Sequence, residues 1–425
     1  MSAAYTSSIA EAIAPDLLQR FQRYVVIDTQ SRRDQDRQPS TPGQLDLSRL
    51  LVAELAEAGL ADARLDEHGY VYATLPANQE GAPAIGLIAH VDTSPDAPGA
   101  GVKPIVHRGY DGGVIELPRH GTRLDPAAMP ELADKVGHDL VTASGDTLLG
   151  ADDKAGVAAI MAAVTYLAAH PELPRCKLCV AFTPDEEIGK GAARFDVPRF
   201  GARFAYTVDG SELGELQDES FSALEAIIRI EGVEVHPGQA AGKLVSALRL
   251  AAQIVAELPS DRLTPDTAAE RDGFIHPYEL TGTASRAEIR VILRDFDEER
   301  LAEHRELLEQ TARRVVGGDS RARLHIDVSR QYRNMRQFIE QAPELVEAAE
   351  EAMRAEGIEP VRRAIRGGTD GSLLSEMGLL TPNLFDGGHE YHSPREWASL
   401  QEMAASAATL VRLAGVWAAR TPGDG

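Results

Sequence analysis

Residues 154–184 read KAGVAAIMAAVTYLAAHPELPRCKLCVAFTP and join two patterns that decide the fold. The first part is rich in alanine and has apolar residues at helical spacing, which predicts a helix over residues 154–170. The second part, LCVAF, is an apolar run without polar alternation, which is typical of a strand covered on both faces. A helix followed by such a strand indicates an α/β sheet with helices on its faces.

The same alternation of apolar runs and helical segments continues on both sides of this stretch. A helix is expected at about residues 15–27, and a long terminal helix from about residue 396. Three further apolar runs indicate strands, namely GYVYATLP at 69–76, APAIGLIAHVDT at 82–93 and FAYTVDG at 204–210. The predicted fold class is therefore α/β, with a sheet that is at least partly parallel.

Residues 218–330 have a different pattern. Their strand-like segments, such as AEIRVILRDFD at 287–297, alternate polar and apolar residues. Such strands predict an antiparallel sheet with one open face and helices over the other. A chain of 425 residues is also long for one core. We expect an inserted domain at 218–330 and a discontinuous domain of residues 1–217 and 331–425.

Composition limits the partners of the chain. The formal net charge is -23, whereas surfaces that bind nucleic acid or anionic lipid need clustered Lys and Arg. The N-terminus has no basic segment followed by an apolar stretch, and no apolar run reaches about 18 residues. We expect a cytoplasmic protein that binds neither nucleic acid nor membrane.

The chain has two cysteines, Cys176 and Cys179, in a CxxC spacing. This spacing occurs in zinc knuckles and redox pairs, but one pair is at most half of a knuckle. The local sequence reads as a strand, in which positions three apart face opposite sides, so the two sulfurs are expected to diverge.

Five residues that can bind metal ions lie in five short motifs. They are His90 in HVDT, Asp152 in LLGADDKAG, Glu187 in TPDEEIG, Asp209 in YTVDG and His392 in YHS. Four of the five follow apolar runs closely, and in an open α/β sheet a site forms beyond the carboxyl ends of the strands. Together, these motifs indicate a two-metal hydrolase.

In HVDT, His90 and Asp92 are two residues apart, so their side chains point to the same side of a strand. An imidazole that binds a metal through one nitrogen needs its other N–H held, and a nearby carboxylate does this. We assign His90 as a ligand and Asp92 as its orienting partner. For this motif alone, a plain hydrogen-bonded pair at a strand end is the alternative.

Two pairs of adjacent carboxylates are expected to divide their roles. Asp152 and Asp153 precede the Ala-rich helix, where Asp153 fits a helix N-cap and Asp152 fits a carboxylate that bridges two metals. In TPDEEIG, Glu187 fits a metal ligand, and Glu186 fits the base that takes a proton from the attacking water. A solvated turn is the ordinary explanation of such a Glu pair, and only the set of motifs favours a catalytic role.

Asp209 and His392 complete the set. They give each ion one His and one carboxylate in addition to the bridge. Mixed N and O ligation with open positions is typical of catalytic zinc sites, and such ligands also accept Co or Mn. The sequence predicts two Zn(2+) ions per subunit. It contains no GxSxG elbow and no complete Walker loop, which excludes those nucleophile and nucleotide motifs.

In order and spacing, the motifs resemble those of the peptidase T family of tripeptide aminopeptidases. This family is part of a zinc-dependent superfamily of aminoacylases and carboxypeptidase G-like enzymes, and the resemblance covers nearly the whole chain. The motifs that carry it are HVDT, GADDKAG, TPDEEIG, YTVDG, VHPG, RDFD, RNMR, IRGGTDG and YHS.

The resemblance implies how the ligands are shared. One ion is expected on His90, Asp152 and Asp209, and the other on Asp152, Glu187 and His392, with Glu186 as the base. It also implies a cis peptide bond after Asp152. The inserted domain is implied to be a lid and dimerisation domain, which makes the protein a homodimer, and the discontinuous domain to be the catalytic one.

The resemblance also implies two substrate-binding residues, and a glycine-rich turn offers two more. His236 in VHPG is expected to reach the scissile carbonyl or its oxyanion, and Arg294 in RDFD to hold the C-terminal carboxylate of the peptide. In RGGTDG, Arg366 and Thr369 are expected to contact the peptide. From the residues alone, His236 in VHPG is a turn residue, and a plain tight turn is the alternative for RGGTDG.

The chain departs from the family pattern in several places, namely DTAAERDGF at 266–274, Ser246, His389 and Ser393. None of these residues is an expected ligand or the base, so the departures bear on substrate choice. The expected activity is release of the N-terminal residue from short peptides, tripeptides above all. A dipeptidase, a carboxypeptidase, an N-acyl amino acid amidohydrolase and a non-catalytic metal-binding protein are the alternatives.

Overall fold

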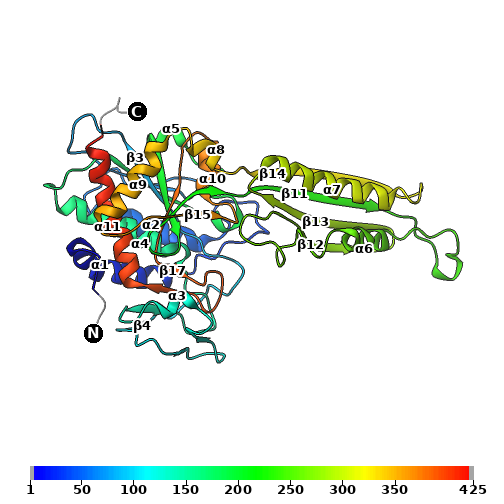
Figure 1. The fold of residues 1–425 in the computed structure, drawn as a ribbon, viewed down its shortest axis with the longest axis horizontal. Coiled ribbons are helices and arrows are strands. Elements are labelled where there is room, and N and C mark those ends of the chain that lie inside the picture. The colour runs from blue at the N-terminus through cyan, green and yellow to red at the C-terminus, as the bar shows by residue number, and fades with distance from the viewer. Residues whose placement is uncertain (1–3, 421–425) are drawn as a thin grey trace. The chain divides into compact units, whose positions relative to one another are not determined.

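In a computed structural model, which describes residues 4–420, the apolar runs of the sequence form the centre of an eight-stranded sheet (Figure 1). Its four central strands run parallel, and the strands β1, β2 and β10 pair in antiparallel fashion. In spatial order, the sheet contains β1 (Arg64–Leu65), β2 (Val71–Leu75), β8 (Leu178–Thr183), β3 (Ile85–His90), β9 (Phe204–Gly210), β16 (Asn383–Phe385), β10 (Glu215–Ser220) and β15 (Val361–Ile365). The predicted α/β class is confirmed.

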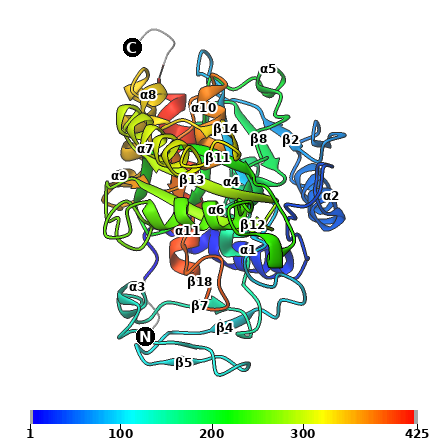
Figure 2. The same cartoon turned by 90° about the vertical axis from the view of Figure 1, so that its right-hand side faces the viewer.

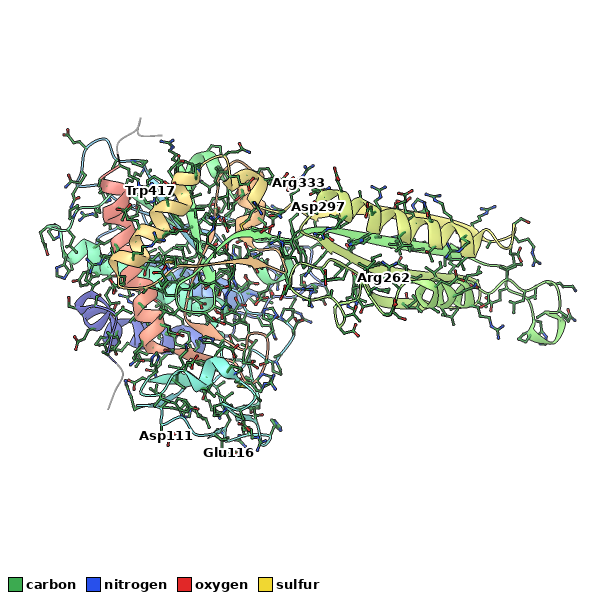
Figure 3. All side chains as sticks on the ribbon, viewed as in Figure 1. Asp111, Glu116, Arg262, Asp297, Arg333 and Trp417 are labelled. Carbon is green, nitrogen blue, oxygen red and sulfur yellow. The ribbon has the colours of Figure 1, made fainter. Side chains whose placement is uncertain are left out.

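Helices cover the faces of this sheet, as expected. α4 (Ala151–Ala169) packs on β3 and β9, and α1 (Ser8–Val25) and α11 (Leu400–Ala418) pack on α4 (Figure 1). Most residues of α4 are buried, as expected for a helix that is apolar all round. Trp417, near the end of α11, donates its indole N–H to the Tyr206 hydroxyl at 3.0 Å (Figure 3). The remaining helices of this part are α2 (Pro42–Glu57), α3 (Pro130–Ala133), α5 (Val197–Phe200), α8 (Arg336–Ile339), α9 (Pro343–Ala355), α10 (Asp370–Glu376) and the 3-10 helix η1 (Glu186–Ile188).

Two helices begin elsewhere than predicted. α1 begins at Ser8 because the Ser7 side chain accepts hydrogen bonds from the N–H groups of Ile9 and Ala10, so Pro15 lies inside the helix. α11 begins at Leu400, after a short strand, with Ser399 as its cap. In both places a serine cap, rather than the apolar pattern, decides the boundary.

A second, small sheet has the order β17 (Gly388–His389), β18 (Trp397–Ser399), β7 (Leu140–Thr142) and β4 (Ile105–His107). Beside it lies the hairpin of β5 (Ile115–Glu116) and β6 (Arg123–Leu124), and Figure 2 shows β4, β5 and β7 grouped with α3. Trp397 and residues of the 110–140 segment form its core. This sheet anchors both ends of the loop that contains His392.

The described chain forms two compact units. Unit 1 contains the residues up to Asp218, Met335–Arg363 and the residues from Thr369 onward, and unit 2 contains Glu219–Asn334 and Ala364–Gly368. The sequence-based division placed the inserted domain at 218–330 and did not assign residues 364–368 to it. These five residues are the last two of β15 and the three that follow it, a stretch too short for the sequence pattern to show the return.

Unit 2 is an antiparallel sheet with helices. Its strand order is β12 (Phe274–Gly282), β13 (Arg286–Asp295), β11 (Ser222–Glu231) and β14 (Arg323–Tyr332). Along β13, buried residues alternate with more exposed ones, and the buried side chains pack against α6 (Ala247–Glu257) and α7 (Glu298–Val316). Asp297 caps α7 (Figure 3). A single-turn 3-10 helix, η2 (Pro237–Gln239), follows His236.

Two further expectations concern cysteine and membranes. Cys176 and Cys179 are both buried free thiols, and burial raises the pKa of each thiol above its usual value. Within residues 4–420, no helix combines the length and the apolar character that crossing a membrane requires.

A buried charge cluster joins α1 to α2. Glu54 on α2 accepts hydrogen bonds from Arg20 and, at 2.5 Å, from the Tyr24 hydroxyl, and it also pairs with Arg23. Arg20 and Glu54 are both buried. Two buried charges are stable only together, because removal of one leaves the other without a partner in an apolar setting.

We predict that Glu54→Ala lowers the free energy of unfolding of unit 1 by about 3 kcal/mol, because the buried Arg20 loses its buried carboxylate partner and keeps the half-exposed Asp16. Urea denaturation measures this change. Asp46→Ala is the control, since it removes the exposed Arg49–Asp46 pair and should cost less than about 1 kcal/mol. Equal effects of the two variants would contradict the account of the buried cluster.

Candidate metal centre

His90 is the last residue of β3, and Asp92 holds its ring at Nδ1. His90 Nδ1 lies 3.0 Å from the backbone oxygen of Asp92 and 3.4 Å from its carboxylate. The Asp92 carboxylate also accepts the N–H groups of Glu186 at 2.9 Å and Glu187 at 3.1 Å. Asp92 therefore holds the turn after β8 as well as the imidazole, and Nε2 of His90 is left to face the site.

Asp152 lies in a turn that leads into α4. Gly150 has φ +84°, a conformation that suits glycine, and Asp152 and Asp153 have non-helical backbone angles. The peptide bond between Asp152 and Asp153 is cis, as the resemblance implied. The buried Asp153 carboxylate accepts the N–H of Gly156 at 3.1 Å, the predicted capping contact, and that of His90 at 3.0 Å.

The structure brings the five expected ligands together in two groups that share Asp152. His90, Asp152 and Asp209 form one group, and Asp152, Glu187 and His392 form the other; within each group the ligand atoms lie within 4.8 Å of one another. Asp152 Oδ1 lies 2.9 Å from His90 Nε2, and Asp152 Oδ2 lies 3.2 Å from His392 Nε2. One oxygen of the shared carboxylate therefore faces each group.

Glu187 completes the second group. Its Oε2 lies 3.0 Å from His392 Nε2, while its Oε1 is buried and has no hydrogen-bond partner among the described residues. A buried carboxylate oxygen without a donor is costly unless a cation faces it. The donor set of two imidazoles and three carboxylates, without thiols, matches the ligands that divalent ions accept at catalytic sites. The residues present therefore fit a pair of divalent cations.

The pKa values in the two groups show how much negative charge the site holds. Burial, together with the Asp152 carboxylate, raises the pKa of Glu187 to about 8 and that of Asp209 to about 6. Burial lowers the pKa of His392, but hydrogen bonds to Asp152 and Glu187 outweigh this and raise it to about 11. Hydrogen bonds to Asp152 and Asp209 likewise raise the pKa of His90 despite its burial. Without ions, protons on the imidazoles and carboxylates offset the negative charge of the site. Bound cations would replace these protons.

Glu186 belongs to neither group. It is adjacent to Glu187 in η1, which begins after Asp185 in a left-handed conformation at φ +62°. Burial, together with the nearby Asp209 and Asp370 carboxylates, raises the pKa of Glu186 well above its usual value. A carboxylate with a raised pKa beside a charged site suits a group that accepts a proton and then returns it.

The sequence analysis missed three acidic residues that hold the loops of the site. Asp96 lies 3.4 Å from His392 Nδ1 and pairs with Arg33, so it orients that ring. The buried Asp185 accepts hydrogen bonds from Ser40 and Gln44 and ties η1 to the start of α2. Glu396 accepts three backbone N–H groups around Asp152. No local pattern marks these residues, because their partners are distant in sequence.

Residues that depart from the family pattern have structural contacts. Ser246 caps α6 by accepting the N–H of Arg249. His389 stacks on Trp397 at 4.0 Å between ring centres and lies 2.9 Å from the Glu402 carboxylate. Ser393 donates to the backbone oxygen of Glu390. These contacts within the protein explain the three residues without a role in substrate binding.

The four expected substrate-binding residues fall in both units. His236, Arg294 and Arg366 belong to unit 2, whereas Thr369 belongs to unit 1. Thr369 is the N-cap of α10, and its hydroxyl donates to Asn383 at 3.3 Å. Arg366 donates to the backbone oxygens of Glu270 at 2.9 Å and Ala268 at 3.2 Å. The geometry thus gives Thr369 and Arg366 structural contacts in addition to their expected roles.

His236 and Arg294 keep free donors. His236 Nδ1 accepts the N–H of Gly238 at 3.2 Å, so the neutral ring carries its proton on Nε2. The exposed imidazole can therefore donate from Nε2. Arg294 donates to the backbone oxygen of Arg366 at 3.3 Å, but its buried Nε has no partner among the described residues.

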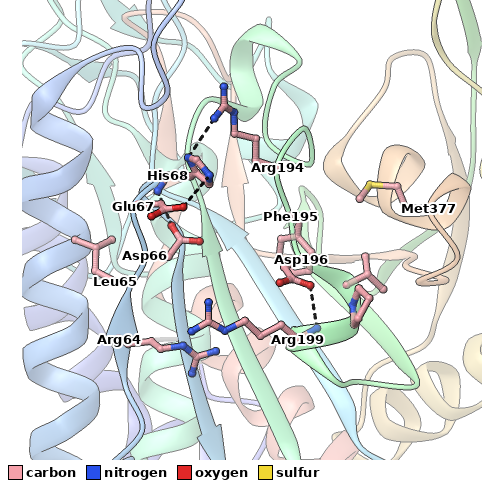
Figure 4. A pocket seen from close by; sticks show the side chains of 12 residues that line it. Arg64, Leu65, Asp66, Glu67, His68, Arg194, Phe195, Asp196, Arg199 and Met377 are labelled. Carbon is pink, nitrogen blue, oxygen red and sulfur yellow. Dashed lines mark hydrogen bonds and ion pairs between the residues drawn. The ribbon is translucent and has the colours of Figure 1, made fainter.

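A surface pocket of about 880 Å³ in unit 1 lies apart from the candidate ligands, none of which lines it. Its wall combines Arg64, Arg194 and Arg199 with Asp66, Glu67 and Asp196, so both signs of charge are present (Figure 4). This pocket has no grouped metal ligands and is not the candidate site.

Comparison with known proteins agrees with this geometry. The sequence model of peptidase family M20/M25/M40 matches residues 146–415. The chain is 47% identical over 404 residues to peptidase T of Desulfitobacterium hafniense (strain Y51), which covers 95% of this chain and 98% of the relative. The chain belongs to peptidase family M20/M25/M40. The resemblance seen in the sequence motifs is thereby confirmed, and the protein is a hydrolase of peptide bonds.

Solved structures of the M20 fold superpose on the chain. The crystal structure of the aminopeptidase PepT from Bacillus cereus has a TM-score of 0.74 at 22% identity and covers 95% of this chain and 99% of its own. A tripeptidase from Staphylococcus aureus also has a TM-score of 0.74, at 20% identity, and covers 96% of this chain and 99% of its own. These likenesses establish the fold.

Proposed function

We propose that the chain is a metal-dependent aminopeptidase that releases the N-terminal residue from short peptides, with tripeptides as the preferred substrates. The observation that carries this proposal is the Asp152 carboxylate shared between two groups of His and carboxylate ligands, with Glu186 beside them. The close relationship to peptidase T supports the choice of substrate.

The proposed cofactor is a pair of Zn(2+) ions, with Co or Mn as alternatives. His90, Asp152 and Asp209 would hold one ion, and Asp152, Glu187 and His392 the other. When bound, two such ions polarise a peptide carbonyl and lower the pKa of water. The orphaned Oε1 of Glu187 and the two imidazole Nε2 atoms that face carboxylates support this assignment.

The catalytic work of the chain itself is assigned to Glu186, with Asp92 as its positioning partner. Glu186 accepts a proton from the attacking water and passes it to the nitrogen of the leaving amine, so its carboxylate is regenerated. Asp92 fixes the backbone of Glu186 and the ring of His90. It thereby holds the base and a candidate ligand at fixed positions relative to each other.

Substrate binding is assigned to His236, Arg294, Arg366 and Thr369. The Nε2 proton of His236 suits donation to a developing oxyanion. The unpartnered Nε of Arg294 suits a carboxylate, which a guanidinium binds through two parallel N–H groups. Arg366 supports Arg294 through its backbone oxygen and holds the 266–272 loop.

Association and location also belong to this proposal. β12 is an edge strand of the unit 2 sheet, and its Tyr278 and Leu280 are 42% and 41% exposed. An exposed edge strand with apolar side chains favours pairing with a second copy, so a homodimer through unit 2 is proposed. The cytoplasmic location expected from the sequence stays a prediction.

We predict that the zinc-loaded protein releases free N-terminal alanine from trialanine faster than from dialanine or tetraalanine, and does not hydrolyse N-acetylalanine. The products are followed by chromatography under matched conditions. Because both ends of trialanine are alanine, the end that is cleaved is read from Ala-Gly-Gly, where release of glycine before alanine would assign a carboxypeptidase. Cleavage of dialanine or N-acetylalanine alone would make the enzyme a dipeptidase or an amidohydrolase.

We predict that Glu186→Gln lowers kcat on the best substrate by about 10²–10⁴-fold, because general-base catalysis has this size, while two metal ions still bind. Steady-state kinetics and elemental analysis of the same preparation measure both quantities. Glu172→Gln, at an exposed glutamate after α4, is the control and should keep full kcat. A fully active Glu186→Gln enzyme would remove Glu186 from the mechanism.

A further inference from the structure

Glu396 directs its whole carboxylate at one turn of the backbone. Oε2 accepts the N–H groups of Leu149 at 2.6 Å and Gly150 at 2.7 Å, and Oε1 accepts that of Asp152 at 3.0 Å. The residue is 1% exposed. The three donors are neutral amides, and the buried Lys154 also interacts electrostatically with this carboxylate.

In the turn that Glu396 holds, Lys154 N–H donates to the Gly150 oxygen at 3.3 Å, whereas the three N–H groups named above donate to Glu396. Gly150 is left-handed, and Asp152 and Asp153 have non-helical angles, so the regular bonds of α4 begin only beyond them. Buried N–H groups need an acceptor, and a carboxylate makes stronger bonds to them than a neutral oxygen does. Glu396 therefore sets the backbone from which the Asp152 side chain projects.

Glu396 also lies on the loop that supplies the other histidine ligand. His392 is four residues earlier, in a left-handed conformation at φ +57°. The loop is closed by the hydrogen bond from Glu396 N–H to the Ser393 oxygen at 3.1 Å, and its far end is fixed where Ser399 N–H donates to the Gly387 oxygen. Two distant segments that each provide a candidate ligand are thus joined by one side chain.

We propose that Glu396 is a positioning residue that fixes the shared carboxylate of Asp152 relative to His392. It contacts neither substrate nor the proposed ions and acts through the backbone N–H of Asp152. This inference rests on the proposed function, because it concerns ions held by Asp152. Since Asp152 belongs to both ligand groups, displacement of its backbone weakens both sites together.

A glutamine at this position is the sharpest test. It has nearly the same shape but only one oxygen, so its NH₂ group must face at least one of the three N–H donors. Two donors cannot bond to each other, and the turn must shift. Loss of a residue that orients a metal ligand typically lowers metal affinity by about 10–100-fold.

The experiment titrates Co²⁺ into the metal-free wild-type protein, Glu396→Gln and Glu356→Gln, and follows the visible absorption of the bound ion. Glu356 is a matched control, since it is also 1% exposed and accepts hydrogen bonds from Thr6 and Arg412 away from the ligands. We expect Glu396→Gln to bind Co²⁺ about 10–100-fold more weakly, with a changed spectrum and a lower kcat. Glu356→Gln should lower thermal stability and keep the wild-type spectrum.

Wild-type affinity and spectrum in Glu396→Gln would overturn the role of Glu396. If that variant does not fold, Glu396→Asp, which keeps both oxygens on a shorter side chain, is judged by the same two readouts. A different result would contradict the proposed function. In that case the wild-type protein and Asp152→Ala would bind Co²⁺ with equal affinity.

Discussion

The site depends on one electrostatic constraint, the concentration of carboxylates around the shared Asp152. Asp152, Glu187 and Asp209 lie within reach of only two imidazoles. Burial and the neighbouring Asp152 carboxylate raise the pKa of Glu187 and Asp209, which means that the fold holds these groups in a setting that disfavours their charged forms. Positive charge must compensate them, from protons on His90 and His392 or from divalent cations. The need for cations therefore follows from where the fold places its acids.

Other acidic side chains keep these groups in place. Their carboxylates accept hydrogen bonds from backbone N–H groups of the site. Asp92 accepts the N–H groups of the η1 turn, Asp153 accepts that of His90, and Glu396 accepts those of the Asp152 turn. Each of these contacts fixes the main chain of a candidate ligand or of the base. A carboxylate used in this way gives rigid support without an added cation, which suits a site that must keep its geometry as ions bind.

The sequence allowed much of this arrangement to be predicted, and the reasons are local. The parallel centre of the sheet was predictable because LCVAF and AIGLIA lack polar alternation. The grouping of the candidate ligands was predictable because each lies in a short motif, four of them near strand ends that meet at one edge. The supporting residues were not predictable, since Glu396 finds its partners nearly 250 positions earlier in the chain. The return of residues 364–368 to unit 2 depends on similar long-range contacts, such as the bond from Phe221 N–H to the Ile365 oxygen.

The most direct test of the account is anomalous diffraction from crystals of the metal-loaded enzyme, collected at the absorption edge of the metal that elemental analysis detects. The account predicts two anomalous peaks about 3.5–4 Å apart, on either side of the Asp152 carboxylate. One peak should lie against His90 and Asp209, and the other against Glu187 and His392. A single peak, or peaks away from Asp152, would contradict the central claim that this carboxylate is shared by two ions.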